Sequence, residues 1–195
     1  MRQFFGMSQR GNLKEAVQGL ADPQLIMLMS NGNQFEEHVE ELERLFPNVP
    51  SIGCIGMCYD TRVAESGVGV APFTGGVVAA ANVLEQVSLM PVKYIRRLEL
   101  DLGKVNASEQ DTVCIDFCSG NDACVLNTIH TALRHRNVSL VGGTGDGGRV
   151  SANGRVYKDS VAYAIVKNQN GRVKAYKENI YRRMDEHRFI ASDTD

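Results

Sequence analysis

The two halves of this sequence contain the same kinds of segment in the same order. In each half an apolar run leads into a polar turn with a Gly-Asn pair, a helical stretch, an Asn-Val pair and a second apolar run. The Gly-Asn pairs begin at residues 32 and 120 and the Asn-Val pairs at 48 and 137, so the two spacings differ by a single residue. A fixed period in a chain indicates a repeated structural unit. We therefore predict two units, residues 23–103 and 110–192, in a single domain spanning residues 1–195.

Each predicted unit contains an amphipathic helix. Over residues 34–46 large apolar side chains recur from Phe35 to Phe46 at intervals of four, three and four residues, which places them on one helical face. The second unit has a similar stripe from Val125 to Leu133, at intervals of four. The opposite face of the first helix is rich in Glu, so we expect that face to be in solvent.

Short apolar runs on either side of these helices predict strands that are buried on both faces: residues 25–29, 51–55, 112–117 and 138–141. Alternating residues predict half-buried antiparallel strands over 94–102, where Leu98, Leu100 and Leu102 alternate with acidic residues, and over 161–165. An extra strand and a helix over 12–20 precede the first unit. The predicted fold is α/β, with two pseudo-symmetric β-α-β-β-β units forming mixed sheets and helices packed on the outer faces.

Charge and hydropathy exclude several classes of protein. The 21 Lys and Arg residues nearly balance 23 Asp and Glu, giving a net charge of −2 with no dense basic cluster, so we expect no nucleic acid partner. The sequence has no apolar run of about 18 residues, the length that spans a membrane, and no signal-peptide stretch at its start. We therefore predict a cytoplasmic protein without a membrane span. Its 5 cysteines, an odd number, fit a reducing compartment.

Polar and glycine residues follow the predicted buried strands, where ligands usually bind in sheets with β-α connections. We predict a small-molecule site there. Its polar contacts are Ser30, Asn31, Asn33, Ser119, Asn121, Thr144 and Asp146, its close backbone approaches are Gly53, Gly120, Gly142 and Gly143, and Cys54 and Cys118 lie at the strand ends. Two alternatives need no ligand. The Ser and Asn residues could cap the helices, and the glycine-rich segment could be a flexible turn without the Lys or the spacing of a nucleotide loop.

The cysteines repeat a C-x3-C pattern at Cys54 and Cys58 and at Cys114 and Cys118. In a strand the members of each pair would be about 13 Å apart on one face, too far to share one ion, so we predict buried free thiols, no metal and no cofactor. Three of the four histidines lie on predicted helices with no evident route to a cysteine, and no Ser-elbow or zinc-protease motif occurs. We therefore predict no catalytic residues and a protein that is not an enzyme.

Four segments together resemble the N-terminal portion of the FIST sensory domain: residues 49–54 (VPSIGC), 140–146 (LVGGTGD), 153–162 (NGRVYKDSVA) and 187–191 (HRFIA). The resemblance implies a cytoplasmic input module that binds a small ligand such as an amino acid. Its signal would pass either to a chemoreceptor, with a role in chemotaxis, or to a histidine kinase. The C-terminal partner domain usual in that family is not present within the 195 residues. The family has no shared set of ligand contacts that could be carried over to this sequence.

The leading hypothesis is therefore a non-catalytic signal-transduction input domain that binds a small polar ligand between its two units and passes the signal to a downstream domain or kinase. The alternatives are a cysteine-based metal or redox sensor, a protein-interaction scaffold, and a hydrolase or transferase that uses a cysteine. The sequence does not indicate the ligand, the output domain or the oligomeric state.

Overall fold

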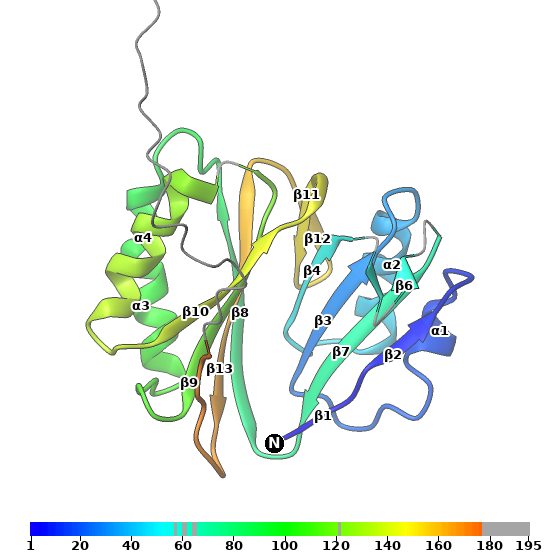
Figure 1. Ribbon diagram of the computed structural model, residues 1–195, viewed down its shortest axis with the longest axis horizontal. Helices are drawn as coiled ribbons and strands as arrows, with labels where there is room; N and C mark the ends of the chain where they lie inside the picture. The colour runs from blue at the N-terminus through cyan, green and yellow to red at the C-terminus, as the bar shows by residue number, and fades with distance from the viewer. Residues whose placement is uncertain (57, 60–61, 64–65, 121, 177–195) are drawn as a thin grey trace, which may run out of the picture.

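The computed structural model describes residues 1–56, 58–59, 62–63, 66–120 and 122–176. These residues form four layers, in which two sheets face each other and helices cover the outer face of each sheet (Figure 1). Helices α1 (Leu13–Ala16) and α2 (Phe35–Leu45) cover one sheet, and α3 (Ile95–Lys104) and α4 (Asp122–Arg134) cover the other. The predicted α/β class, with mixed sheets and helices on the outer faces, is confirmed.

The first sheet has seven strands in the order β1-β7-β3-β4-β11-β12, with β2 also pairing with β7. Its parallel pair is β3 with β4, which α2 connects, while β7 lies antiparallel to β3 and β11 antiparallel to β4. The strands are β1 (Arg2–Gln3), β2 (Gly6–Ser8), β3 (Leu25–Ser30), β4 (Ser51–Ile55), β7 (Val68–Thr74), β11 (Asp146–Ala152) and β12 (Arg155–Tyr157).

The second sheet has four strands in the order β10-β9-β13-β8. Its parallel pair is β9 with β10, which α4 connects, and β13 lies antiparallel to both β9 and β8. The strands are β8 (Val77–Glu85), β9 (Thr112–Cys118), β10 (Ser139–Thr144) and β13 (Ser160–Asn168). A separate two-stranded hairpin consists of β5 (Cys58–Tyr59) and β6 (Arg62–Val63). A 3-10 turn, η1 (Pro91–Tyr94), leads into α3.

The two sheets exchange strands along the chain. β8 follows β7 but joins the second sheet, while β11 and β12 follow β10 but join the first. Both sheets contain a β-α-β unit with a later strand antiparallel to its first strand, namely β7 beside β3 and β13 beside β9. This shared connectivity describes the topology only, and the duplication of the sequence and its unit boundaries stay a prediction.

Three apolar clusters hold the layers together. Alternate residues of the central strands point to opposite faces, as strand geometry requires. In β3, for example, Leu25 and Met27 pack between the sheets while Ile26 and Leu28 pack against the first helical layer. The third cluster joins the second sheet to α3 and α4. The space between the sheets is therefore largely a packed core, and any ligand must enter where side chains leave it open.

The prediction of a strand over 94–102 was wrong, because these residues form η1 and α3. The Leu-x-Leu-x-Leu pattern satisfies a helical period as well as alternation, and burial shows which period applies. Leu98 and Leu102, four residues apart, are buried, whereas Leu100 is 60% exposed. Similarly, the helix predicted over 12–20 is only the single turn of α1.

Two predictions of strand burial were also wrong. β13 is buried on both faces rather than half-buried, because it lies between β9 and β8 with a helical layer on one side and the first sheet on the other. β10 is an edge strand, and Val141 in it is 42% exposed rather than covered on both sides. By the repeat, the second unit is predicted to close with a strand at 188–191, the counterpart of 94–102, but these residues lie outside the described part of the chain.

Candidate functional site

A cavity of about 270 Å³ lies where the carboxyl ends of both parallel strand pairs meet between the two sheets. It is lined by Met29, Cys54, Ile55, Gly56, Phe117, Gly143, Thr144, Gly145 and Asp146. The first four come from the ends of β3 and β4, Phe117 comes from β9, and the last four come from the end of β10 and the turn into β11. The chain crosses from the second sheet to the first at this turn, so both sheets contribute to one site.

The cavity brings together four of the residues predicted from sequence: Cys54, Gly143, Thr144 and Asp146. The backbone explains their proximity. Gly145 donates its N–H to the carbonyl of Cys118 at 2.9 Å, and Asp146 pairs with Ile55 in the first sheet. A side chain at Gly145 would begin 2.8 Å from the Cβ of Cys54, so the absence of a Cβ permits this crossing.

The Cys54 thiol is held in its neutral form. Burial raises the pKa of Cys54 to about 12, and the negative charge of Asp146 adds to the effect. A thiolate is the form of cysteine that attacks electrophiles and binds metals. At neutral pH Cys54 is therefore a small apolar wall of the cavity with a weak S–H donor, close to an acidic group.

The cavity combines one charge with an apolar floor. Asp146 is exposed at its mouth and carries the only ionisable carboxylate of the described lining. Met29, Ile55 and Phe117 supply apolar surface, and Thr144 supplies a hydroxyl. Because a carboxylate repels anions and attracts ammonium groups, this arrangement favours a ligand with a positively charged head and a small apolar part.

Three other predicted residues, at the end of β3 and in the loop that leads to α2, do not line this cavity. Asn31 is buried, and its amide oxygen accepts N–H bonds from Asn33 at 3.1 Å and Gln34 at 3.0 Å. Its amide nitrogen donates to the Gly67 carbonyl at 3.1 Å. Ser30 is buried and bonds through its hydroxyl to His38 Nδ1 at 2.7 Å, while Asn33 is exposed. Asn31 thus holds the turn that precedes α2. The N-cap residue of α2 is Gln34 and makes no side-chain capping bond, so the capping alternative was wrong for this helix.

Two predicted glycines meet protein atoms rather than an open space. A Cβ on Gly142 would lie 2.1 Å from the carbonyl oxygen of Asp116 in the neighbouring strand β9. A Cβ on Gly53 would lie 2.6 Å from the Ser151 hydroxyl. The close backbone approach predicted at these positions is therefore an approach between strands of this protein.

The remaining predicted residues line two neighbouring cavities. Cys118, Gly142 and Gly143 line a space of about 240 Å³ between β10 and α4, where the Cys118 thiol donates to Asp116 at 3.4 Å. Ser119 and Gly120 line a third space of about 420 Å³, and the Ser119 hydroxyl accepts the Ser160 N–H at 2.8 Å. Asn121 lies outside the described residues.

Sequence reasoning missed the apolar part of the candidate site, namely Met29, Ile55 and Phe117. Each is the last or next-to-last residue of its strand. The strand ends were available from the sequence, but the pairing of the two sheets face to face was not.

The cysteines do not form a metal site in the part of the chain that the structure describes, since no group of three His, Cys, Asp or Glu side chains there could hold an ion. Cys114 and Cys118 both point to the helix-covered face of β9, while Cys54 points between the sheets. Burial also raises the pKa of Cys114, and the charge of Asp116 adds to the effect. Among the described helices, none has the length and apolar character needed to cross a bilayer.

Comparison with known proteins places the chain in a family. A search of the curated proteins finds no matching sequence. The family model described as the FIST N domain matches residues 24–192, which is most of the 195 residues. FIST domains serve sensory and signal-transduction functions. The match includes every strand that lines the candidate cavity, and the chain belongs to the FIST N domain family.

Proposed function

We propose that this domain senses a small metabolite that carries an ammonium group and a short apolar part, such as an amino acid, in the cavity between its two sheets. The observation that carries the proposal is the position of Asp146 at the mouth of a cavity whose other walls are Met29, Ile55 and Phe117. An ammonium group placed against the Asp146 carboxylate would make a charge-assisted hydrogen bond. The apolar part would displace water from the three apolar side chains.

The size of the cavity supports a small ligand. At about 270 Å³ it lies just below the range of roughly 300–1,000 Å³ typical of pockets for drug-sized molecules. The wall at Gly143 faces open space, because a Cβ built on it meets no other atom within 4 Å.

The two-sheet construction supports signalling. Met29 and Cys54 belong to the first sheet, and Phe117 and Gly143 belong to the second, so a ligand that contacts all four favours one relative arrangement of the sheets. A ligand shifts a conformational equilibrium only through its different affinity for the two states. We propose that this shift is passed to a downstream chemoreceptor or kinase in the cytoplasm.

We further propose that the site is not catalytic. At neutral pH the raised pKa of Cys54 leaves it protonated, and a neutral thiol is a poor nucleophile.

The test is thermal unfolding in the presence of amino acids, diamines and small carboxylates. A ligand at 100 times its Kd stabilises a fold by about 2.7 kcal/mol, which for a chain of this size raises the Tm by roughly 5–10 °C. We expect ammonium-bearing ligands to raise the Tm and simple carboxylates to have no effect. Asp146→Asn should lower the affinity for the active ligand at least tenfold. Asp22→Asn is the matched control, since it removes the same charge at the amino end of β3, opposite the cavity.

Equal affinity of the active ligand for wild type and Asp146→Asn would contradict the assigned site. A Tm that no compound in the panel changes would contradict the proposed ligand class.

A further inference from the structure

β8 is an edge strand whose backbone is open along half of its length. Among the described strands it pairs only with β13, so one of its sides faces away from the second sheet. The backbone groups on that side belong to the odd-numbered residues. The carbonyls of Ala81, Val83 and Glu85 accept hydrogen bonds from outside the sheet, and the N–H and C=O of one strand residue point to the same side.

Side chains close the half of this edge formed by residues 82–85. Arg97 donates to the Val83 carbonyl at 2.9 Å, and the Tyr94 hydroxyl donates to the Glu85 carbonyl at 2.8 Å. The Val83 N–H donates to the amide oxygen of Asn82 at 2.9 Å. Asn153, from the turn between β11 and β12, closes the next position by donating to the Ala81 carbonyl at 3.0 Å.

The other half, residues 77–81, is open apart from the Ala81 carbonyl, to which Asn153 donates. Among the described residues none bonds to the outward N–H groups of Ala79 and Ala81 or to the Ala79 carbonyl. Protein edges are usually blunted by Lys, Pro, charge or a bulge. This stretch, Val-Val-Ala-Ala-Ala, has none of these, and its register with β13 is continuous. An unblunted edge of about five residues is long enough to pair with another strand.

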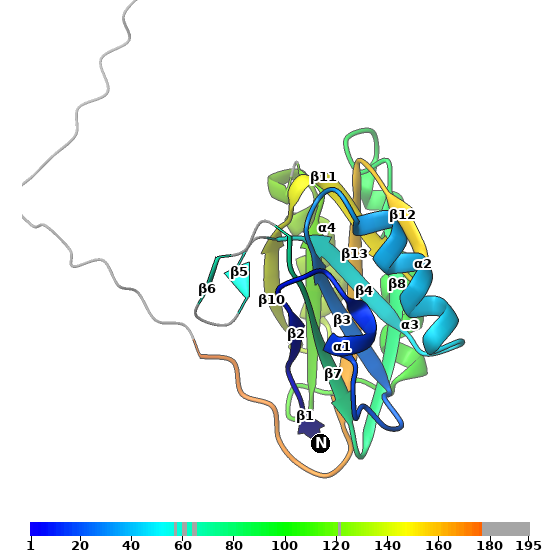
Figure 2. The ribbon, with the colours of Figure 1, turned by 90° about the vertical axis from the view of Figure 1, so that its right-hand side faces the viewer.

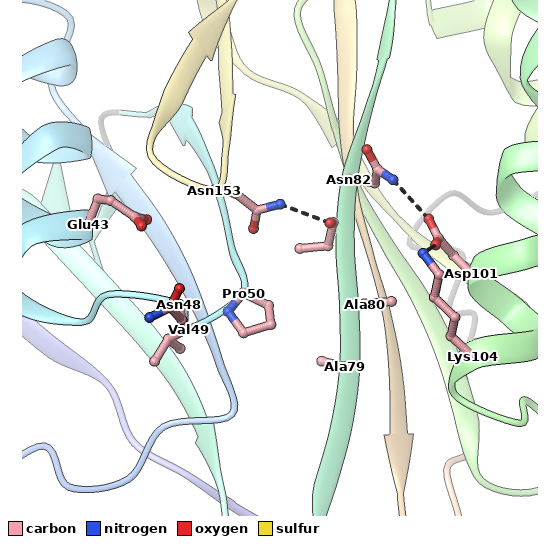
Figure 3. A pocket seen from close by; sticks show the side chains of 11 residues that line it. Glu43, Asn48, Val49, Pro50, Ala79, Ala80, Asn82, Asp101, Lys104 and Asn153 are labelled. Atoms are coloured by element: carbon pink, nitrogen blue, oxygen red, sulfur yellow. Dashed lines mark hydrogen bonds and ion pairs between the residues drawn. The ribbon is translucent and has the colours of Figure 1, made fainter.

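A cavity of about 440 Å³ lies beside this open edge (Figure 3). Ala79, Ala80, Ala81 and Asn82 of β8 form one wall, and the opposite wall comes from the end of α2 and the connection to β4, with Glu43, Asn48, Val49 and Pro50. Figure 2 shows α2, β12 and β8 along one side of the molecule. The Asn153 to Ala81 bond connects the two sheets at the end of this cavity. The edge is therefore recessed, which suits a single extended strand better than the edge of a second folded sheet.

The charges around the cavity favour a basic occupant. Asp101 is buried and already bonded to Lys104 at 2.6 Å, to Asn82 at 3.1 Å and to Tyr163 at 2.7 Å. Glu43, on the opposite wall, is half-buried and has no ion pair with a described Lys or Arg. A positively charged side chain on the occupant would complement the Glu43 carboxylate.

We propose that the open edge of β8 binds an extended segment of a partner protein that pairs with Ala79 and Ala81 and directs a basic side chain toward Glu43. Backbone pairing of this kind supplies affinity, and side chains alternating along the added strand supply specificity. This surface is separate from the ligand cavity of the proposed function, because the two share no lining residue.

The probe is an acetylated, amidated hexapeptide of alternating valine and lysine, titrated into the full ¹⁵N-labelled chain. We expect saturable shifts of the Ala79 and Ala81 amide signals and slower hydrogen exchange at both amides. Replacing the lysines of the peptide by glutamate should weaken binding at least tenfold. Methylating the peptide nitrogens on the pairing side should abolish binding, because it removes the donors that reach the Ala79 carbonyl.

Variants of the protein provide the reciprocal test. Ala79→Pro removes an N–H that does not pair with β13, so it should preserve the fold and lower the affinity for the peptide at least tenfold. The control variant Ala79→Ser keeps this N–H and should bind the peptide as the wild type does. Glu43→Gln should reduce the preference for lysine over glutamate, and Glu40→Gln on the exposed face of α2 is its control. The methylated peptide tests the same hydrogen bonds if Ala79→Pro does not fold.

Three results would overturn the proposal. One is peptide binding that is indifferent to nitrogen methylation, and another is the absence of binding at millimolar peptide. The third is slow exchange of the Ala79 and Ala81 amides in the free chain, which would mean that the edge is already occupied. In that case the mass in solution distinguishes a second copy, which doubles the mass, from a segment of the same chain.

Discussion

Replacing Tyr163 by phenylalanine removes a single hydroxyl from the buried cluster around Asp101. Tyr163 is fully buried in β13, and its hydroxyl donates to Asp101 Oδ2 at 2.7 Å. Asp101 is 2% exposed and keeps two other donors, Asn82 at 3.1 Å and Lys104 at 2.6 Å. The variant therefore leaves the carboxylate partly satisfied but removes its most buried partner.

The expected cost follows from the charge on the acceptor. A hydrogen bond to a charged group contributes about 1.5–3 kcal/mol, against roughly 1 kcal/mol for a neutral pair. We expect Tyr163→Phe to lower the free energy of unfolding by about 2 kcal/mol, which corresponds to a fall in Tm of about 4–8 °C. Tyr94→Phe is the matched control, since the Tyr94 hydroxyl donates to the neutral carbonyl of Glu85 at 2.8 Å. It should cost about 1 kcal/mol.

The assay is urea unfolding of both variants at pH 7 and then at increasing pH. Burial raises the pKa of Tyr163, and the hydrogen bond to Asp101 raises it further. The pKa of Tyr163 is higher in the folded state than its ordinary value of about 10. The stabilisation that the Tyr163 hydroxyl provides is therefore complete below pH 10 and is lost as the pH rises above 10. The difference in the free energy of unfolding between wild type and Tyr163→Phe should therefore become smaller above pH 10. A loss below about 0.5 kcal/mol, or one equal to that of Tyr94→Phe, would refute this reasoning.

Two further predictions concern residues of the predicted ligand site. Asn31→Ala should lower the free energy of unfolding by about 2–3 kcal/mol without changing ligand affinity, because it removes three hydrogen bonds that the buried Asn31 side chain makes around the turn before α2; weaker binding at unchanged stability would contradict this structural role. Iodoacetamide labelling of Cys54 at pH 8, followed by mass spectrometry, should be on the order of a thousandfold slower in the folded protein than in urea, and should rise about tenfold per pH unit toward the pKa of about 12. Equal rates in both states would show an accessible thiolate.

Local patterns in the sequence were sufficient to predict much of the fold. The interval of Phe35, Val39 and Leu42 predicted α2, and short apolar runs predicted β3, β4 and β9, because a helix or strand that buries one or both faces must place apolar residues at its own period. The method failed at 94–102, since leucine at every second position also places leucine at every fourth. Only packing against the second sheet distinguishes the two periods there.

Part of the candidate site was also predicted from local patterns in the sequence. Cys54, Thr144 and Asp146 lie at the ends of strands, and strand ends are visible in a sequence. The side chains they face, Met29 and Phe117, look like ordinary core residues because their apolar character fits any buried strand. The structural role of Asn31 in the turn before α2 also depends on a distant partner, the Gly67 carbonyl.

The sequence by itself determined many of the helices and strands, several strand ends and the family that the chain resembles, because these depend on local period and short motifs. Only the tertiary structure decided that β8 and β11 change sheets, that both sheets line the candidate cavity and that no described residue pairs with part of the β8 edge. Those outcomes depend on long-range strand pairing. The backbone of one strand can form equivalent hydrogen bonds with several other strands, and only the packing of the whole core selects among them.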